Sequence, residues 1–485
     1  MVEFTGSVHS LVAAANKALD DGSVDSALRI AHDFVELVVT EPLFTSQVFA
    51  SKLLDDLCLR IGRVNLESLV GVQRGHSQLT HSETRPRVAY IVSRLQRSGG
   101  HLRLILDFIR SQPEKAHFVY STGVAGPSDR DFFAQALGGG AEAVFFIAPR
   151  GDFGERLTWL QTALLSCAPQ HVFLFNHHQD SVAVSALVPE LGVAGSFCHH
   201  GDHHLCLGVH LEHLAHIDFH PMGFHYCRDE LGVQNQYLPL TFEDKGFLQG
   251  KATTSKKLGI TSATVARSNK VEIPYYVNYV DLIPRVLNVT GGCHVHIGKL
   301  TPWAIKRMRA KIDALGIPQD RFVYIDWTAS VWKSLQQLEV DVYIASFPYG
   351  AGLTLIEVMG AGIPVIMHRH MYSRVLSGLE LAYPEAFNWS DPEKLLDYLG
   401  GLDRESLHME GHKARHWYET FHRPEILKSF LTDPSAFQLP VPPLAPNFKQ
   451  RADEWAAWAE AQMSVPRLFR RSLYRLGRRL RTYLS

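Results

Sequence analysis

The sequence predicts an α/β protein built from two doubly wound domains that face a cleft, with an all-helical segment in front of them. Short, near-continuous apolar runs fall into two series, and such runs are typical of strands buried on both faces of a parallel sheet. Helical stretches alternate with the runs, which is the pattern of a doubly wound fold. At 485 residues, the chain is also too long for one ordinary domain.

The first segment, residues 1–80, is predicted to be helical. Residues 8–21, 24–39 and 44–62 place apolar side chains three and four positions apart. The sequence DDGS at 20–23 predicts a turn with a helix cap. One helical hairpin resembles a tetratricopeptide unit, but no fixed period recurs, which excludes a repeat array. The segment is therefore expected to be a cap or an interaction module.

The two βα series predict domains over residues 85–250 and 260–435, joined by a polar stretch at 241–259. The apolar runs of the first series are 87–93, 116–122, 141–148, 171–176, 193–199 and 216–223. Those of the second series are 263–268, 294–299, 321–327, 340–346 and 363–368. Because ligands of such sheets bind at the carboxyl ends of the strands, we expect functional residues directly after these runs.

The composition excludes several function classes. The 48 Lys plus Arg side chains balance 49 Asp plus Glu, so no global charge indicates a nucleic-acid partner. No run reaches the ~18 apolar residues that a membrane span needs. The start of the sequence lacks the pattern of a secretory leader, and the six cysteines form no C-x-x-C pair. We therefore expect a cytoplasmic protein with reduced thiols.

Residues 341–366, DVYIASFPYGAGLTLIEVMGAGIPVI, carry the strongest functional signal. They predict a strand, a loop with two glycines, a helix and a second strand. Glycines let the backbone approach a ligand, and the free N–H groups of Gly352, Leu353 and Thr354 at the helix start would form an anion site. Glu357, one turn further, can accept two hydrogen bonds from a diol such as a ribose.

This segment resembles the donor-site signature of GT-B glycosyltransferases, in which a Glu precedes a Gly-x-Gly turn and a second Glu follows eight positions later. Gly350 and Gly352 match the turn, Glu357 takes the second position, and Tyr349 stands where the first Glu is expected. The following VMGAGIPVI is similar to the family's A-M-A-x-G-x-P-V-V. The resemblance implies the GT-B fold of two Rossmann-like domains, with a nucleotide sugar bound by the C-terminal one. Tyr349 implies a different contact to the sugar.

The resemblance extends upstream, where ATVARSNK (263–270) is similar to the first strand of the family's nucleotide domain. That strand ends in an Arg and a Lys that clasp the donor diphosphate, and Arg267 and Lys270 stand at those places. Taken singly, these cations and Glu357 would be ordinary solvated charges. Their order and spacing match the family across about 170 residues, which favours the donor site.

Gly99 and Gly100 lie in a predicted strand-to-helix turn within residues 91–110. GT-B enzymes similarly place a glycine pair after their first strand, close to the donor phosphates or the acceptor. A tight turn without any ligand explains the pair equally well.

Histidine is unusually frequent, with 26 in the chain. The segment FCHHGDHHLCLG (197–208) follows a predicted strand, so we expect it at the cleft edge. DHHLCLG resembles the D-H-x-x-x-L-G of some bacterial GT-B enzymes. Asp202 is the candidate base for the acceptor hydroxyl, with His199, His200 or His203 holding the acceptor or the leaving phosphate.

Other interpretations of the histidines remain open. CHHGDH (198–203) is one residue short of the H-x-H-x-D-H string of dinuclear metallohydrolases, and NHHQD (176–180) could add ligands, giving a metal-dependent hydrolase centred on 198–204. That fold supplies no second βα domain with a nucleotide motif. A structural role better explains five further histidines: His210, His213, His216, His220 and His225. A catalytically degenerate GT-B scaffold, favoured by Tyr349, is the third alternative.

Residues 450–485 are predicted to form a basic amphipathic tail. The stretch 467–485 has seven arginines, no acid, and apolar side chains at helical spacing. Such a helix can lie in the interface of an anionic membrane. A disordered tail or a helix packed on the first domain is the alternative. The return of the chain to the first domain, common in GT-B enzymes, is expected at 404–432.

We therefore predict a glycosyltransferase of the hexosyltransferase type. It would move a sugar from a nucleoside-diphosphate sugar, UDP- or GDP-linked, to a hydroxyl of a glycan, lipid-linked or protein acceptor. Polysaccharide or glycolipid synthesis at the inner face of the membrane is the expected setting. Because this fold compensates charge with protein groups, we expect no obligate cofactor and no catalytic metal.

Overall fold

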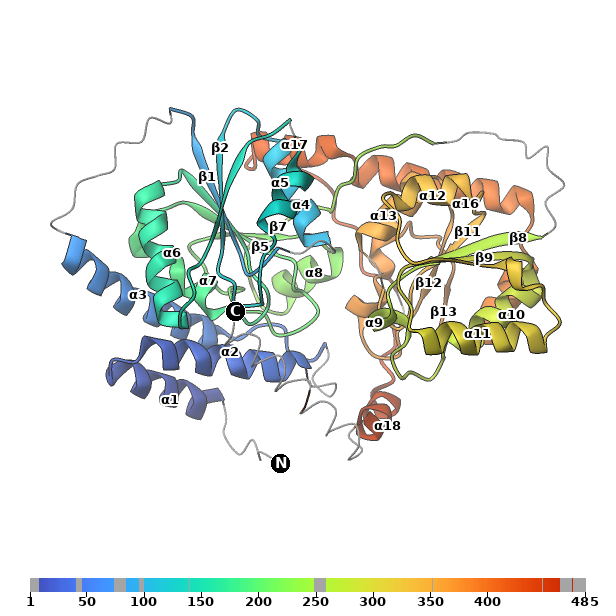
Figure 1. Ribbon diagram of the computed structural model, residues 1–485, viewed down its shortest axis with the longest axis horizontal. Coiled ribbons are helices and arrows are strands. Elements are labelled where there is room, and N and C mark those ends of the chain that lie inside the picture. Colours follow the sequence, from blue (N-terminus) through green and yellow to red (C-terminus); the bar gives the residue numbers. More distant parts are fainter. Residues whose placement is uncertain are drawn as a thin grey trace.

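The computed structural model describes residues 8–40, 46–73, 84–95, 100–138, 140–247, 259–350, 352–446, 448–462 and 473. Two parallel sheets of seven and six strands, each flanked by helices, lie side by side (Figure 1). This confirms the predicted fold class of two doubly wound α/β domains with an N-terminal helical extension. Gly99, part of the predicted linker (248–258) and the predicted tail stretch 467–485, apart from Leu473, lie outside the described residues.

The N-terminal sheet has the order β3-β2-β1-β4-β5-β6-β7, and every neighbouring pair is parallel. Its strands are β1 (Arg87–Val92), β2 (Ala116–Ser121), β3 (Ala143–Ile147), β4 (His171–Phe175), β5 (Gly195–His199), β6 (Ala215–Asp218) and β7 (Asn235–Tyr237). Its helices are α4 (Gly100–Arg110), α5 (Arg130–Leu137), α6 (Phe153–Cys167), α7 (Ser181–Ala186) and α8 (Pro221–Asp229). The predicted run 216–223 divides into a strand and a helix because Pro221, with its fixed φ, suits the first helical position.

The C-terminal sheet repeats this arrangement with the order β10-β9-β8-β11-β12-β13, again all parallel. Its strands are β8 (Ile260–Val265), β9 (Gly291–Ile297), β10 (Phe322–Ile325), β11 (Val342–Ile344), β12 (Val365–His368) and β13 (Asn388–Trp389). Its helices are α9 (Ser268–Val271), α10 (Tyr279–Thr290), α11 (Pro302–Ala314), α12 (Val331–Gln337), α13 (Leu353–Gly360), α14 (Arg374–Ser377), α15 (Pro392–Gly400) and α16 (Arg404–Phe421). Short 3₁₀ turns lie at Pro189–Leu191, Gln319–Arg321 and Leu379–Leu381.

The helical extension comprises α1 (Val8–Asp20), α2 (Val24–Thr40) and α3 (Lys52–Gln73). The third helix therefore begins at Lys52, and the prediction that it begins at residue 44 is wrong. Just before it, the carbonyl of Phe49 accepts a hydrogen bond from the N–H of Cys206, so this segment is held to the loop after β5. Side chains of α2 and α3 share one hydrophobic cluster with α6 and β4, so the extension completes the core of the N-terminal domain.

The chain returns to the N-terminal domain at its C-terminal end, as the sequence predicts. Helix α16 packs against α13 of the C-terminal domain, and α17 (Pro424–Thr432) contacts α4 of the other domain (Figure 1). The N–H of Phe242 donates to the carbonyl of His422 at 2.8 Å, and Arg415 pairs with Asp244 at 2.6 Å. These contacts tie the segment between the sheets to the returning helices. The last described helix is α18 (Ala452–Gln462).

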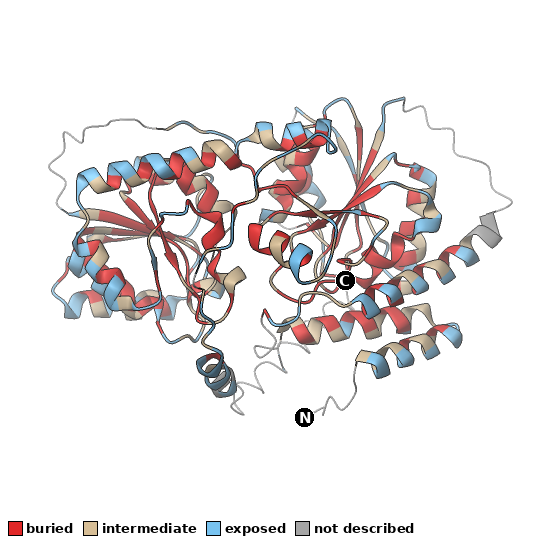
Figure 2. Ribbon diagram, turned by 180° about the vertical axis from the view of Figure 1, so that it is seen from behind, coloured by how far each residue is buried: buried red, intermediate tan, exposed pale blue. Residues whose placement is uncertain are grey.

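Buried residues fill both sheets and the helix faces that turn toward them (Figure 2). The inner strands β1, β4 and β5 are buried on both faces because helices cover each side, which explains why their sequences are apolar without alternation, whereas the edge strand β3 exposes alternate residues. Among the helices that the structure describes, none has the length and apolar character needed to span a membrane.

Candidate functional site

Both sheets carry a topological switch point, where the strand order reverses. In the N-terminal sheet it lies between β1 and β4, and in the C-terminal sheet between β8 and β11. Ligands of doubly wound sheets bind at the carboxyl ends of the strands on either side of such a point. Gly100 follows β1, and the donor-site candidates of the sequence follow β8 and β11, whereas the candidates His200, Asp202 and His203 follow β5, the next strand beyond β4.

At the C-terminal switch point, the structure brings Lys270 to the glycine loop. Its Nζ donates a hydrogen bond to the carbonyl of Gly350 at 2.8 Å, and burial lowers its pKa to about 8. Arg267, the residue before α9, is exposed and makes no ion pair with the residues that the structure describes. One partly buried and one exposed cation therefore stand after β8, next to the loop that follows β11.

The start of helix α13 lies at the same place. Gly352 is the residue before its first turn, and no described side chain caps this end. The first two residues of the helix, Leu353 and Thr354, are only partly buried, so this end of the helix is accessible to solvent. A helix start without a side-chain cap has N–H groups left to bind an anion, and the helix dipole favours negative charge there.

Glu357 and Tyr349 flank this helix start. The Oε2 of Glu357 accepts a hydrogen bond from the N–H of Trp332 at 3.4 Å. Burial raises the pKa of Glu357, and the charges of Lys245 and Arg103 partly offset this. Tyr349 lies at the start of the loop, where its carbonyl accepts from the hydroxyl of Ser346, and burial raises its phenol pKa.

The two domains meet at the starts of α4 and α13. A Cβ added to Gly100 would lie 2.7 Å from Cδ1 of Leu353, so a larger residue at position 100 would require the Leu353 side chain to shift. A Cβ on Gly352 would lie 3.6 Å from Nε2 of His220, which belongs to the N-terminal domain. The loop after β11 in the C-terminal domain therefore faces the histidine-bearing edge of the N-terminal domain.

Histidines gather at that edge because each of them follows one of four adjacent strands, β1, β4, β5 and β6. They are His101 on α4, His177 and His178 after β4, His200, His203 and His204 after β5, and His220 after β6. The rings of His101 and His200 lie 4.3 Å apart between centroids, and those of His178 and His203 lie 4.7 Å apart. Burial lowers the pKa of His101 and of His200, the latter to about 4, so both imidazoles are neutral near pH 7.

Asp202 and His220 form a hydrogen-bonded pair. His220 Nδ1 lies 2.8 Å from Oδ2 of the buried Asp202, and because an ionised carboxylate only accepts, Nδ1 carries the proton and Nε2 is left as an acceptor. Burial opposes the charge on both groups, but their mutual attraction is stronger, so the pKa of Asp202 is lowered and that of His220 is raised. This is the geometry of a base oriented by a carboxylate.

His199 and His203, both candidates from the sequence, have different positions. His203 is partly exposed, 4.0 Å from Asp202, and its pKa is lowered by burial and, in small part, by the charge of Lys270. His199 is 2% exposed and hydrogen-bonded to Asp218, so it is not available to an acceptor or a phosphate. Cys198 and His199 are successive residues of β5, so their side chains point to opposite faces of the sheet, and the string 198–203 does not converge on one metal.

The sequence pattern favours a structural role for His220 and does not single out His101. The signal for His220 was present, because it follows a strand at the carboxyl edge of the sheet. The signal for His101 was its place directly after the glycine pair. The sequence alone does not distinguish these two histidines from the others, because it does not show which of them share an edge of the sheet.

The helical extension supports the same edge. The carboxylate of Asp55 on α3 accepts hydrogen bonds from the N–H groups of Gly208 at 2.7 Å and His210 at 2.9 Å. Asp55 is fully buried, and burial raises its pKa to about 7 although these two bonds lower it. The loop that begins at His200 is therefore anchored, near its end, to helix α3 of the extension.

Comparison with known proteins agrees with this architecture. Neither a family model nor a curated protein sequence matches the chain. Among solved structures, a glycosyltransferase from Rickettsia africae is 11% identical, covers 72% of this chain and 98% of its own, and gives a TM-score of 0.56. Alr3699/HepE of Anabaena in complex with UDP is 10% identical, with 72% and 99% covered and a TM-score of 0.54.

A third similar structure is the lipopolysaccharide outer core galactosyltransferase WaaB. It is 15% identical, covers 71% of this chain and 98% of its own, and gives a TM-score of 0.50. At such identities the likeness speaks for the fold alone. Together with the two parallel sheets and their facing switch points, it shows that this chain has the GT-B fold, the fold of these glycosyltransferases.

Proposed function

We propose that the protein transfers a sugar from a nucleoside-diphosphate sugar to a hydroxyl acceptor. The observation that carries this proposal is the meeting of two different sites at one junction. An anion-binding helix start with Lys270 belongs to the C-terminal domain, and a carboxylate-oriented histidine of the N-terminal domain faces it. A transferase needs these two elements within reach of one another.

The donor would bind at the C-terminal switch point. Its diphosphate would lie against the N–H groups of Leu353 and Thr354 and the charges of Lys270 and Arg267. Glu357, held near the start of α12 by the N–H of Trp332, has a second carboxylate oxygen that can accept from a ribose hydroxyl. The diphosphate leaving group would thus be stabilised without a catalytic metal.

His220 would act as the base. Its Nε2 takes the proton of the acceptor hydroxyl, the acceptor oxygen forms a bond to the anomeric carbon, and the bond from that carbon to the phosphate oxygen breaks. The electron pair leaves with the nucleoside diphosphate, whose added charge meets Lys270 and the start of α13. Asp202 keeps the proton on Nδ1 and stabilises the imidazolium that forms. Asp202 itself is too buried to be the base, so its proposed role changes from base to positioning residue.

Finer assignments rest on the sequence. A UDP- or GDP-linked hexose as donor, a glycan, lipid-linked or protein acceptor, and cytoplasmic surface-glycan synthesis are supported by the resemblance to GT-B enzymes. WaaB, named for the lipopolysaccharide outer core, is compatible with a glycan acceptor. Association with an anionic membrane through residues 467–485 is supported by their charge pattern.

A donor-turnover assay tests the proposal. The purified chain is incubated with UDP-, GDP-, ADP- and CMP-sugars and a mixture of glycan and lipid-linked acceptors, and nucleotide release and acceptor mass are measured. We expect one donor class to give release together with an acceptor mass increased by one sugar. Lys270→Ala should lower this rate strongly, whereas Lys306→Ala, which removes an exposed cation on α11, should not.

Two results would contradict the proposal. Release that is equal in Lys270→Ala and in the wild type would place the reaction elsewhere. Nucleotide binding without turnover for any donor would favour a scaffold that keeps the fold and the donor site without catalysis.

A further inference from the structure

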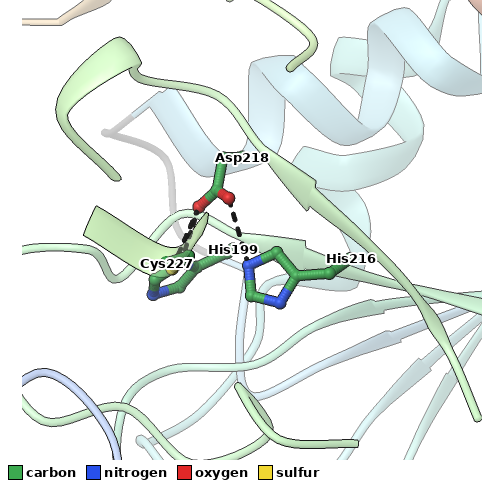
Figure 3. A group of neighbouring side chains, drawn as sticks. All are labelled: His199, His216, Asp218 and Cys227. Atoms are coloured by element: carbon green, nitrogen blue, oxygen red, sulfur yellow. Dashed lines mark hydrogen bonds and ion pairs between the residues drawn. The ribbon is translucent and has the colours of Figure 1, made fainter. Parts of the chain in front are cut away.

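Four side chains with metal-binding chemistry lie together in the N-terminal domain (Figure 3). They are His199 at the end of β5, His216 and Asp218 on β6, and Cys227 on α8. Their ligand atoms all lie within 4.8 Å of one another, and none of the four residues is more than 4% exposed. Two imidazoles, a carboxylate and a thiol form a complete set for a borderline divalent cation such as zinc.

The distances between the ligand atoms suit a tetrahedral ion. His199 Nδ1 lies 2.8 Å from Asp218 Oδ1, and His216 Nε2 lies 3.3 Å from Asp218 Oδ2. Cys227 Sγ lies 3.6 Å from His199 Nδ1 and 3.7 Å from Asp218 Oδ1. Zinc–ligand bonds of ~2.0–2.3 Å at tetrahedral angles separate the ligand atoms by about 3.3–3.8 Å. Small side-chain movements would therefore place all four atoms around one ion.

Neighbouring groups hold two of the ligands in a metal-binding orientation. His216 Nδ1 lies 3.3 Å from the carbonyl of Val209, which places the proton on Nδ1 and leaves Nε2 for an ion. The amide of Asn235 donates to Asp218 Oδ2 at 2.6 Å, so Oδ1 is the oxygen left for the ion. Such outer hydrogen bonds to a histidine and a carboxylate are characteristic of metal ligands.

Charge balance also favours an ion. A buried carboxylate is costly unless its charge is compensated. A divalent cation with one carboxylate, one thiolate and two neutral imidazoles gives a buried centre of zero net charge. The thiol of Cys227 would lose its proton to solvent on binding.

We propose that His199, His216, Asp218 and Cys227 bind one Zn²⁺ in a closed site that has a structural role. Four protein ligands leave no open position, so the ion would not activate water. This differs from the metallohydrolase alternative, because only His199 comes from the string 198–203 and the other three ligands come from β6 and α8.

The site would fix the geometry of the proposed base. His199 precedes Asp202 by three residues, and Asp218 precedes His220 by two. A Cβ on Gly223 of α8 would lie 2.9 Å from Oδ2 of Asp202 and 3.2 Å from Oδ1 of Asp218, so both carboxylates lie against the start of one helix. Zinc would join β5, β6 and α8 directly behind the pair. This consequence for catalysis rests on the proposed function, whereas metal binding does not.

The metal content of the full chain tests the site. The protein is produced in zinc-supplemented medium, purified without an immobilised-metal column, dialysed, and analysed by inductively coupled plasma mass spectrometry. We expect about one zinc per chain. After exchange with Co²⁺, a thiolate-to-cobalt charge-transfer band should appear in the near ultraviolet and should be absent in Cys227→Ser. Cys198→Ala, which changes the neighbouring thiol of β5 outside the ligand set, should keep the band.

The zinc content and the cobalt spectrum of the wild-type chain test the site even if a variant fails to fold. Zinc well below one equivalent together with no charge-transfer band on adding Co²⁺ would overturn the site. A band that survives in Cys227→Ser but disappears in Cys198→Ala would assign the metal to other ligands. Transfer activity is measured separately, so a chain with zinc but no turnover would contradict only the proposed function.

Discussion

The two switch points share one topology and differ in chemistry. In each sheet the order of the first six strands is the same, and each places its informative loops at the carboxyl ends of the strands around the reversal. After β8 and β11 stand glycines, two cations and an uncapped helix start. After β4, β5 and β6 stand histidines with neutral or carboxylate-paired rings. The fold supplies two equivalent positions, and the loop residues determine that one suits an anion and the other a proton transfer.

The two regions also differ in their supports. The histidine edge is held from behind by the helical extension, through Asp55, and by the His199–Asp218 cluster. The glycine loop is held mainly by its own domain, through Lys270 and the bond from the N–H of Gly350 to the carbonyl of Leu376. A proton transfer needs a fixed geometry, whereas backbone N–H groups are already oriented by their helix. This contrast leads to the following predictions.

The largest effect is expected from His220→Gln. Glutamine can keep the hydrogen bond to Asp202 but cannot accept a proton, so turnover should fall by about 10²–10⁴-fold while donor affinity stays unchanged. Steady-state kinetics and a donor titration measure the two quantities. His225→Gln on α8, the helix that begins after His220, is the control, since its ring bonds the carbonyl of Pro442. Loss of donor binding in His220→Gln would mean that His220 belongs to the donor site.

The next effect concerns Lys270. Lys270→Met removes a positive charge beside the diphosphate and the hydrogen bond to Gly350. Donor affinity should therefore fall by about 10–150-fold, which corresponds to the ~1.5–3 kcal/mol of a charged hydrogen bond. Isothermal titration with the nucleoside diphosphate measures it. Arg267→Met should weaken binding less because Arg267 is exposed. The reverse order would show that the exposed cation carries the diphosphate.

A pH profile distinguishes a base from a binding residue. The pairing with Asp202 raises the pKa of His220 above 6.5, so turnover should fall as the pH drops through that raised value. In Asp202→Asn the attraction is lost, so the acid limb of kcat/KM should move to lower pH while the maximal rate falls. A limb that stays in place in Asp202→Asn would contradict the assignment of His220.

The smallest effect concerns stability. The pKa of Asp55 is raised from 3.8 to about 7 in the folded chain, so the folded state binds this proton more tightly than the unfolded state. The resulting stabilisation is complete below about pH 4 and is lost as the pH rises to about 7. Urea midpoints should therefore decline more steeply over this range in the wild type than in Asp55→Asn. Asp56→Asn, an exposed neighbour, should follow the wild type, and equal slopes in all three would count against a buried proton on Asp55.

Much of this arrangement could be predicted from the sequence. The fold class is predicted by the apolar runs. Gly350, Gly352 and Glu357 lie in one strand–loop–helix unit after β11, and Lys270 joins them because β8, which it follows, is the parallel neighbour of β11. The histidines were harder. Their roles depend on which strand ends share an edge. They also depend on the alternation of side chains along β5, by which His199 points away from the edge that His200 occupies. That pairing of strands is a tertiary fact, so nothing in the sequence joins Asp202 to His220 rather than to His203.

The most direct test of the central claim is a thermal-shift measurement of the purified chain with UDP-, GDP-, ADP- and CMP-sugars. A ligand at 100 times its Kd should add about 2.7 kcal/mol to the free energy of unfolding, which raises Tm by a few degrees. Stabilisation by one nucleotide class, lost in Glu357→Ala and kept in Glu405→Ala on the surface of α16, would support a donor site at the C-terminal switch point. No stabilisation by any nucleotide sugar, or stabilisation that persists in Glu357→Ala and Lys270→Ala alike, would contradict it.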